Sequence, residues 1–293
     1  MAVYNQDGTQ LEYVYNVQES IIDTAYDAYG QVVYESGVDP YAYYDINAIF
    51  SKSRNNAQGM DIYGNYMAVY DGSNYTIGII DITSKTTVHT LSTSLKNHGN
   101  DVTFSKNFYD NNDPFPILYV EGKGLRLDLN NQTTIRVDDI KATPTGDTWV
   151  TYGTAFNDDM SKYYCMGYNT NNFSDPNGFI FLEIWDTSES IENPTRISSV
   201  IREWFPCIQG VAYHDGLLWV ASGIDNPAVE PKVYTLDITD ASIVKTVDLT
   251  RTGELEGIGW GYDESTDKWF CVYGQIYNGI TYYRIDFSSK PIE

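Results

Sequence analysis

One motif recurs five times along this chain and limits the folds that the chain can adopt. In each copy a strand-like run ends in an apolar or aromatic residue, followed by an Asp, an unmatched residue and a small hydroxyl or amide side chain. The copies are Ile80-Asp81-Ile82-Thr83, Leu127-Asp128-Leu129-Asn130, Trp185-Asp186-Thr187-Ser188, Leu236-Asp237-Ile238-Thr239 and Ile285-Asp286-Phe287-Ser288. Successive Asp residues are 47, 58, 51 and 49 positions apart, which is the spacing of circular or stacked repeat proteins. The sequence therefore predicts five related units.

Each unit has room for four short strands. A second signature, with a polar residue, a small or acidic residue and then an apolar run, begins at Gln58, Asn100, Tyr152, Gln209 and Glu256. Another apolar run lies between the two signatures, at 66–70, 117–120, 163–168, 217–221 and 269–273. A fourth run follows the Asp motif in four copies, at 86–91, 133–137, 196–201 and 243–249. Four antiparallel strands per unit, separated by turn-forming clusters, are typical of a β-propeller blade.

The fifth unit has too few residues after its Asp motif for a fourth strand. An open sheet edge exposes unpaired backbone groups, so another segment is expected to cover it. Residues 41–50 are rich in aromatic and β-branched side chains, and we expect them to supply that strand. The predicted fold is all-β: a five-bladed β-propeller over residues 37–293, closed by an N-terminal strand. Separate short sheets, a β-solenoid and a sixth, degenerate blade are the alternatives.

The charge of the chain limits its partners. Its 18 basic and 40 acidic residues give a net charge of -22, whereas phosphate binding requires a surplus of Lys and Arg, so we expect no nucleic-acid partner. We also expect no membrane insertion, because no apolar run approaches the ~20 residues of a membrane span. Residues 1–5 lack the basic start and apolar core of a secretory signal. Cys165 and Cys271 occupy equivalent places in their units and are expected to be buried apolar side chains.

A different repeat occupies the first 36 residues. Tyr4-Asn5, Tyr15-Asn16 and Tyr26-Asp27 are each eleven residues apart. The Gly, Asn and Asp content disfavours a helix, so the sequence predicts a small β-repeat module with turns near 6–8 and 28–30. Three such repeats have little core of their own, and we expect the module to attach to a partner chain or scaffold. Residues 36–40 are the predicted linker to the propeller.

Candidate binding residues open the first strand of each unit. Because the innermost strands of a propeller begin near its axis, these residues are expected to converge at one end of a channel. They would bind a neutral polar ligand such as a sugar, or a cation, with Trp260 available for stacking. The candidate ligand-binding residues are Gln58, His98, Asn100, Asp101, Tyr152, Gln209, Glu256 and Trp260. The alternative is that these groups bond to one another and to water, and hold the blades in register.

Catalytic and metal-binding chemistry has weaker sequence support. His98 would need an orienting carboxylate, from Asp101 or Glu256, to act as a general base. His89 is expected on an outer strand and His214 in a turn. The acidic clusters 110–113 and 157–159 resemble calcium ligands but lack the spacing of a calcium loop, so solvated turns explain them better. We expect no cofactor, with Ca²⁺ as the one alternative.

The N-terminal repeats resemble those of tail and receptor-binding proteins from phages and prophages of gut bacteria. The resemblance covers Val3-Tyr4-Asn5-Gln6-Asp7-Gly8 through Ala25-Tyr26-Asp27-Ala28-Tyr29-Gly30-Gln31-Val32, followed by a propeller. It implies a virion protein, made in the host cytoplasm, that joins other tail proteins through residues 1–36 and is a homo-oligomer, for example a trimer. Its propeller would bind a bacterial surface glycan or protein. A scaffold propeller within the virion is a further hypothesis.

A shorter stretch resembles plant and bacterial glutaminyl cyclases. It is Gln209-Gly210-Val211-Ala212-Tyr213-His214-Asp215-Gly216-Leu217-Leu218-Trp219-Val220-Ala221-Ser222-Gly223, with an echo at Glu256-Gly257-Ile258. Those enzymes are five-bladed propellers that cyclise an N-terminal glutamine in an axial channel. The resemblance implies an enzyme with Glu256, Gln209 and His98 around its substrate. Between these hypotheses the sequence favours a non-enzymatic binding role.

Overall fold

The computed structural model describes an all-β protein. The described residues are 3–4, 10–11, 24–26, 32–35, 43–52, 57–142, 150–169, 179–203, 207–224, 230–249, 253–276 and 279–288. They form strands and connecting turns, and none of them forms a helix long and apolar enough to cross a membrane. The chain divides into a larger unit, Ile46–Asp286, and a smaller unit, Met1–Asp45 with Phe287–Glu293. The boundary near residue 36 inferred from the sequence stays a prediction.

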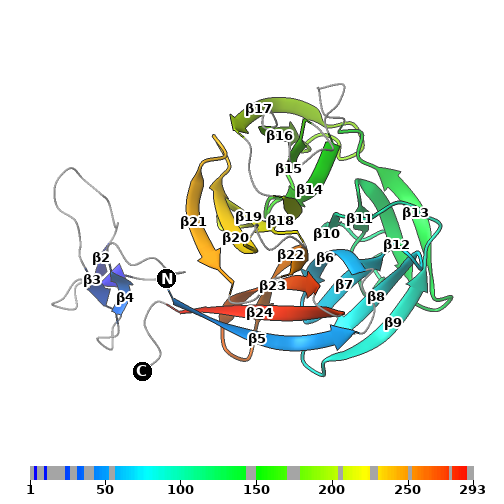
Figure 1. Cartoon of the computed structure of the whole chain (residues 1–293), viewed down its shortest axis with the longest axis horizontal. Helices are drawn as coiled ribbons and strands as arrows, with labels where there is room; N and C mark the ends of the chain where they lie inside the picture. The colour runs from blue at the N-terminus through cyan, green and yellow to red at the C-terminus, as the bar shows by residue number, and fades with distance from the viewer. Residues whose placement is uncertain are drawn as a thin grey trace. The chain divides into compact units, whose positions relative to one another are not determined.

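The larger unit is built from antiparallel four-strand groups that follow the predicted units (Figure 1). One sheet contains β14 (Val150–Phe156), β15 (Lys162–Tyr168), β16 (Phe179–Asp186) and β17 (Thr195–Glu203), in that order. The next contains β18 (Ile208–His214), β19 (Leu217–Ser222), β20 (Lys232–Asp237) and β21 (Ile243–Asp248). Chain order and spatial order agree in both sheets, as expected when short turns join neighbouring strands.

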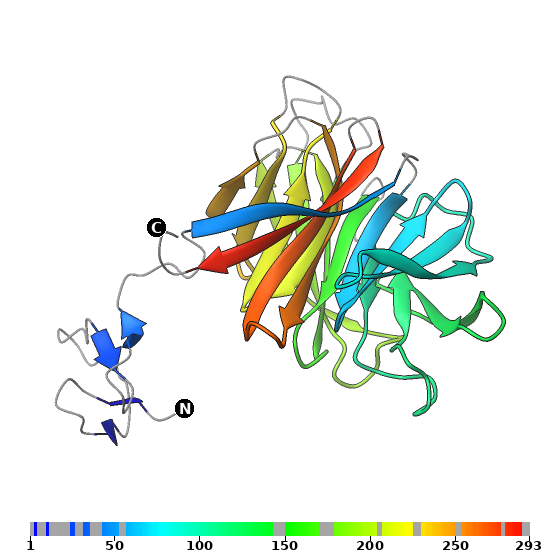
Figure 2. The ribbon, with the colours of Figure 1, turned by 90° about the horizontal axis from the view of Figure 1, so that it is seen from below.

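The sheet of the fifth unit is completed by a strand from before the first unit. Its order is β22 (Glu254–Asp263), β23 (Lys268–Ile276), β24 (Ile280–Ser288) and β5 (Tyr43–Lys52). Ser51 and Thr281 share a hydroxyl hydrogen bond of 3.0 Å, and the rings of Phe50 and Tyr282 lie 6.2 Å apart. Figure 2 shows β5 running along β24. The predicted closing strand is therefore present, and it covers the edge of β24.

The first two units share one eight-stranded sheet, which the sequence did not predict. The first unit contributes β6 (Ala57–Tyr63), β7 (Tyr66–Asp71), β8 (Thr76–Asp81) and β9 (Thr86–Ser92), and the second contributes β10 (Val102–Phe104), β11 (Leu118–Val120), β12 (Lys123–Asp128) and β13 (Thr133–Asp139). The outer strands β9 and β13 meet in a parallel pair at Ser92 and Thr133. Ser92 N–H donates to the Gln132 carbonyl at 3.0 Å, and Thr133 Oγ1 donates to the Ser92 carbonyl at 3.2 Å. This short contact joins the two groups into one sheet, in addition to the contacts between their inner strands β6 and β10.

The repeated Asp closes the turn after the third strand of a unit. Asp81 Oδ1 accepts hydrogen bonds from Thr83 N at 2.8 Å and Ser84 N at 3.0 Å. Asp128, Asp186 and Asp237 make equivalent bonds to backbone N–H groups two or three residues later. Such Asx turns fix the chain reversal by a local bond. The motif recurs in the first four units because each needs the same reversal, whereas Asp286 of the fifth unit pairs with Arg284.

The first strands of the five units, which we call the inner strands (β6, β10, β14, β18 and β22), contact one another in closed order from β6 to β22 and back to β6. The small residue of the second signature lies where neighbouring inner strands touch. A Cβ on Gly210 would lie 2.7 Å from Gly257 Cα, and one on Gly257 would lie 2.6 Å from the Met60 nitrogen. Gly257 also has a φ of +63°. Glycine is therefore required there by close backbone approach and, at Gly257, by conformation.

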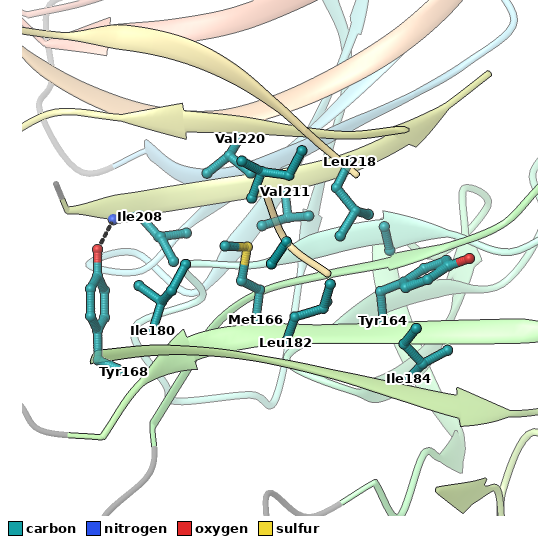
Figure 3. Close-up of a cluster of buried hydrophobic side chains, with 13 residues drawn as sticks. Tyr164, Met166, Tyr168, Ile180, Leu182, Ile184, Ile208, Val211, Leu218 and Val220 are labelled. Carbon is teal, nitrogen blue, oxygen red and sulfur yellow. Dashed lines mark hydrogen bonds between the residues drawn. The ribbon is translucent and has the colours of Figure 1, made fainter. Parts of the chain in front are cut away.

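The core lies between the faces of neighbouring sheets. Met166 and Leu182 on one sheet pack with Val211 and Leu218 on the next, all at most 3% exposed (Figure 3). The Tyr168 hydroxyl accepts a hydrogen bond from the Ile208 N–H at one edge of this cluster. Cys165, Cys207 and Cys271 are buried free thiols. Apolar packing of sheet on sheet therefore stabilises the larger unit.

The smaller unit contains one sheet of short strands in the order β2-β1-β3-β4. The strands are β1 (Val3–Tyr4), β2 (Gln10–Leu11), β3 (Thr24–Tyr26) and β4 (Val32–Glu35). Val3 pairs with Leu11, and Thr24 pairs with Glu35, in antiparallel registers. Strands thus flank both predicted turns. The turns at 6–8 and 28–30, Tyr15-Asn16 and the linker at 36–40 lie outside the described residues.

Candidate functional site

The starting end of the inner strands, where Gln58, Gln209 and Glu256 lie, is a buried polar cluster. These three side chains are 8%, 7% and 3% exposed. Gln209 Nε2 donates to Glu254 Oε1 at 2.8 Å, which links β18 to β22. Burial and the nearby Glu254 raise the pKa of Glu256 well above its usual value, while a bond with Gln58 lowers it. The structure therefore brings these three predicted residues together, bonded across neighbouring inner strands.

Asp101 makes a similar link between the second and third units. Its carboxylate accepts hydrogen bonds from Thr154 N at 2.8 Å and from Thr154 Oγ1. Asp101 is 4% exposed, and burial raises its pKa to about 8. Both carboxylate oxygens are thus used in bonds to Thr154. Asp101 joins two sheets, and its bonds do not orient His98.

The remaining predicted residues lie apart from this cluster. The Tyr152 ring stands edge-on to Tyr168, with ring centroids 5.5 Å apart. His98 is exposed between β9 and β10, and its Nδ1 is hydrogen-bonded to Asn100 Oδ1. Trp260 lies four residues beyond Glu256 on β22, toward the finishing end of the inner strands. The eight predicted residues do not form one pocket.

A cavity lies at the finishing end, where the inner strands terminate. Its volume is about 230 Å³, and residues of all five inner strands line it. We call it the aromatic pocket, because seven of its lining residues carry aromatic rings: Tyr63, Phe104, Phe156, Tyr213, His214, Trp260 and Trp269. Flat apolar faces with a few polar groups are typical of ligand pockets. This cavity is therefore a candidate binding site.

His214, Trp260 and Trp269 form one side of the aromatic pocket. The His214 ring stacks on Trp260 at 4.0 Å with an angle of 17°, and lies 4.7 Å from Trp269. His214 is the last residue of β18 and is 8% exposed, so it lies in a strand, one residue before the turn in which the sequence placed it. Burial lowers the pKa of His214, against the raising effect of Asp215 and Asp158. Trp269 is 51% exposed and so presents an indole to solvent at this site.

Asp61 brings a carboxyl group deep into the aromatic pocket. Its Oδ2 accepts hydrogen bonds from Phe104 N at 2.6 Å and Thr103 Oγ1 at 3.4 Å, whereas its Oδ1 takes part in neither bond. The side chain is surrounded by protein yet remains partly accessible, because it lines the cavity. Burial raises its pKa to about 7, although the bond from Phe104 N lowers it. A perturbed carboxyl in a pocket is a recognised mark of a functional site.

Two charged side chains, Asp158 and Lys106, lie where the pocket meets solvent. Neither forms an ion pair with another side chain in the described ranges. The acidic cluster 157–159 forms a turn, in which Asn157 Oδ1 accepts a hydrogen bond from Lys162 N at 2.8 Å. Asp159 Oδ1 accepts from Ser161 N at 2.9 Å. Asp158 is left to face the pocket.

A second hollow, of about 690 Å³, lies between the sheet of the fifth unit, which includes β5, and the first unit. Arg284 lines this hollow, and its guanidinium carbon lies over the Phe270 ring, 4.0 Å from the ring centroid. Arg284 also pairs with Asp263 at 2.9 Å and with Asp286 at 2.7 Å. Hydrogen bonds from Ser265 and Arg284 lower the pKa of Asp263 to about 2. Because Arg284 is already paired with two carboxylates, the hollow is a weaker binding candidate.

The described residues contain no group of three or more His, Cys, Asp or Glu side chains placed to hold a metal ion. In the predicted cluster 110–113, Asp113 pairs with Arg126 at 2.6 Å, and Asp110 Oδ1 accepts from Asn112 N at 2.9 Å. These bonds close a turn and anchor it to β12. They give the cluster a structural role within the second unit.

No family model matches this chain, and no curated protein matches its sequence. A luciferin-regenerating enzyme is similar in structure, with 12% identity and a TM-score of 0.53 over 84% of this chain and 97% of that one. The glutaminyl cyclase of Myxococcus xanthus shows 12% identity and a TM-score of 0.46 over 84% of this chain and 96% of its own. The tail fiber of Staphylococcus aureus phage P68 shows 12% identity and a TM-score of 0.48, over 84% of this chain and 53% of its own. The similarity to the luciferin-regenerating enzyme shows that the fold is propeller-like, and it shows nothing about function. We draw no conclusion from the other two structures.

Proposed function

We propose that this chain is a receptor-binding protein of a phage or prophage tail that recognises a bacterial surface glycan in the aromatic pocket. The observation that carries the proposal is the cavity itself, with aromatic rings converging from five inner strands and a half-exposed Trp269 at its edge. Aromatic faces stack on the apolar faces of sugar rings, while carboxyl and hydroxyl groups bond sugar hydroxyls. Asp61 and Thr103 supply such groups.

In this proposal the larger unit is a five-bladed β-propeller, with one blade per repeat. The closed order of contacts among the inner strands and the addition of β5 beside β24 support that count. A closed circle places the ends of all first strands near one axis, where a shared pocket forms. The fold by itself hosts many activities, so the function is argued from the pocket.

The placement on a tail is supported by the N-terminal repeats and their resemblance to phage and prophage proteins. The smaller unit has a short, separate sheet, which suits attachment to a partner chain. We propose that residues 1–36 join other tail proteins, in a homo-oligomer such as a trimer, and that the propeller binds the host surface. Attachment and recognition would then be performed by different parts of the chain.

The test is binding of the full chain to immobilised bacterial surface glycans and to whole bacteria. We expect saturable binding that falls at least tenfold in Trp269→Ala, because the indole is removed from the pocket. Ile243→Ala is the matched control: Ile243 is equally exposed, at 51%, but lies on outer strand β21. Periodate treatment of the cells should abolish binding, and protease treatment should not.

Two outcomes contradict the proposal. Loss of binding after protease but not after periodate indicates a protein receptor. Release of ammonia from peptides with an N-terminal glutamine, abolished in Glu256→Gln, indicates a cyclase that acts at the starting end.

A further inference from the structure

The aromatic pocket has the composition of a site for a positively charged group. Its rings come from Tyr, Phe and Trp side chains, whose faces carry partial negative charge and attract cations. The imidazole of His214 is held toward its neutral form by burial, so it adds no positive charge to that wall. A neutral sugar can also use these stacking faces, so the charges around the pocket distinguish the two classes of ligand.

The charged groups around the pocket are mainly acidic. Asp61 lies deep in the cavity, where its Oδ2 accepts hydrogen bonds from Phe104 N and Thr103 Oγ1, and Asp158 lies at the rim. Besides burial, the negative charges of Asp158, Asp159 and Asp215 help to raise the pKa of Tyr213. Against the lowering effect of burial, Asp158 and Asp215 also have a raising effect on the pKa of His214. Lys106 is the one cation among the lining residues. The net charge of the chain, -22, has the same sign and attracts cationic ligands over a longer range.

We propose, building on the function proposed above, that the part of the glycan inserted into the aromatic pocket carries an ammonium group. The source is either the free amine of an amino sugar or a quaternary ammonium substituent. The rings contact the apolar surface of the cation, Asp61 pairs with it from within, and Asp158 pairs with it from the rim. A volume of about 230 Å³ suits one sugar ring or one trimethylammonium group.

The test compares charged ligands with neutral counterparts of the same shape, by calorimetric titration of the full chain. Choline is paired with 3,3-dimethylbutan-1-ol, and glucosamine with glucose. We expect the charged member of at least one pair to bind at least tenfold more tightly than its neutral counterpart. The pair that shows this difference identifies the source of the ammonium group.

Three variants locate the effect. Asp158→Asn and Asp61→Asn should each weaken binding of the charged ligand at least fivefold and leave the neutral ligand unchanged. Asp139→Asn changes the net charge equally, but Asp139 ends outer strand β13 and should have no effect. Asp158 is exposed, so its variant should fold even if Asp61→Asn does not.

The proposal is overturned if neutral ligands bind as tightly as charged ones, or if all three variants bind the cation equally. In the first case the glycan-binding function still stands, because Trp269→Ala would still abolish binding to cells. If Trp269→Ala leaves cell binding intact, the aromatic pocket is not the receptor site and both proposals fail.

Discussion

The two ends of the inner strands differ in what their side chains contact. At the starting end, Gln58, Gln209 and Glu256 are buried and bonded across neighbouring strands. At the finishing end, aromatic rings surround a cavity, and Trp269 is half exposed. The same five strands thus fasten the sheets to one another at one end and leave an open pocket at the other.

This difference separates stability from recognition along one set of strands. Polar groups that bond one another across strands keep the sheets in register, as the sequence alternative supposed. The rings at the finishing end border a cavity that leaves room for a ligand. Changes at the starting end should therefore alter the free energy of unfolding, and changes at the finishing end should alter binding.

The largest expected effect is on the close contact of inner strands. Gly257→Ala should lower the free energy of unfolding by about 3 kcal/mol or more, because Ala strains a φ of +63° and its Cβ meets the Met60 nitrogen at 2.6 Å. Gly216→Ala is the control, since Gly216 has a φ of +77° but open space around it. It should cost about 1 kcal/mol. Chemical denaturation measures both, and equal losses would contradict the close contact.

The pH dependence of stability tests Asp61 and Asp101, the two carboxyls that are bonded to the inner strands of the next units. The pKa of Asp61 is raised to about 7 and that of Asp101 to about 8, from 3.8, so the folded state binds their protons more tightly than the unfolded state. Their contribution is full below about pH 4 and is lost as the pH rises through these folded values. We expect the free energy of unfolding to fall by about 2 kcal/mol between pH 7 and pH 9.

The double variant Asp61→Asn/Asp101→Asn should flatten this dependence, because neither amide titrates. Asp139→Asn, at an exposed carboxylate, should keep the wild-type profile. A double variant with an unchanged slope would show that other groups cause the loss of stability.

A smaller effect is expected at the bond between β18 and β22. Gln209→Ala removes the donor to Glu254 and should lower the free energy of unfolding by about 1 kcal/mol. Binding to glycans should be unchanged, in contrast to Trp269→Ala, which should reduce binding without a comparable loss of stability. Thermal melts and binding titrations on both variants measure this pair of effects. If Gln209→Ala abolishes binding, the starting end also contacts the ligand.

The smallest effect is expected for Glu256→Gln. Burial favours the protonated acid at Glu256, and Gln has nearly the same shape as that acid. The change in the free energy of unfolding should stay below about 1 kcal/mol, and glycan binding should persist. A large loss of stability would mean that Glu256 is held as a charged carboxylate.

Much of the fold was accessible from the sequence because it depends on local patterns. Strands occur where the apolar runs predicted them, and the Asp motif recurs because the first four units close the same turn. The glycines at 210 and 257 mark positions where neighbouring strands touch. The shared sheet of the first two units was not predictable, since it depends on one contact between Ser92 and Thr133.

The candidate site was predicted less well. The aromatic residues that end the first runs, such as Phe104, Phe156 and Trp260, recur at equivalent places, and this signal could have indicated the aromatic pocket. His214 precedes Asp215-Gly216, which suggested a turn. Trp269 reaches the pocket from a second strand, β23, so no pattern among first strands could include it.

The sequence by itself determined which residues occupy equivalent positions in each unit, because repetition and alternation are properties of the chain. Only the tertiary structure decided which of those positions face a bonded neighbour and which face a cavity. The reason is geometric: strands in closed contact bring together side chains from units far apart in sequence, and their spacing at each end sets whether they bond one another or leave room for a ligand.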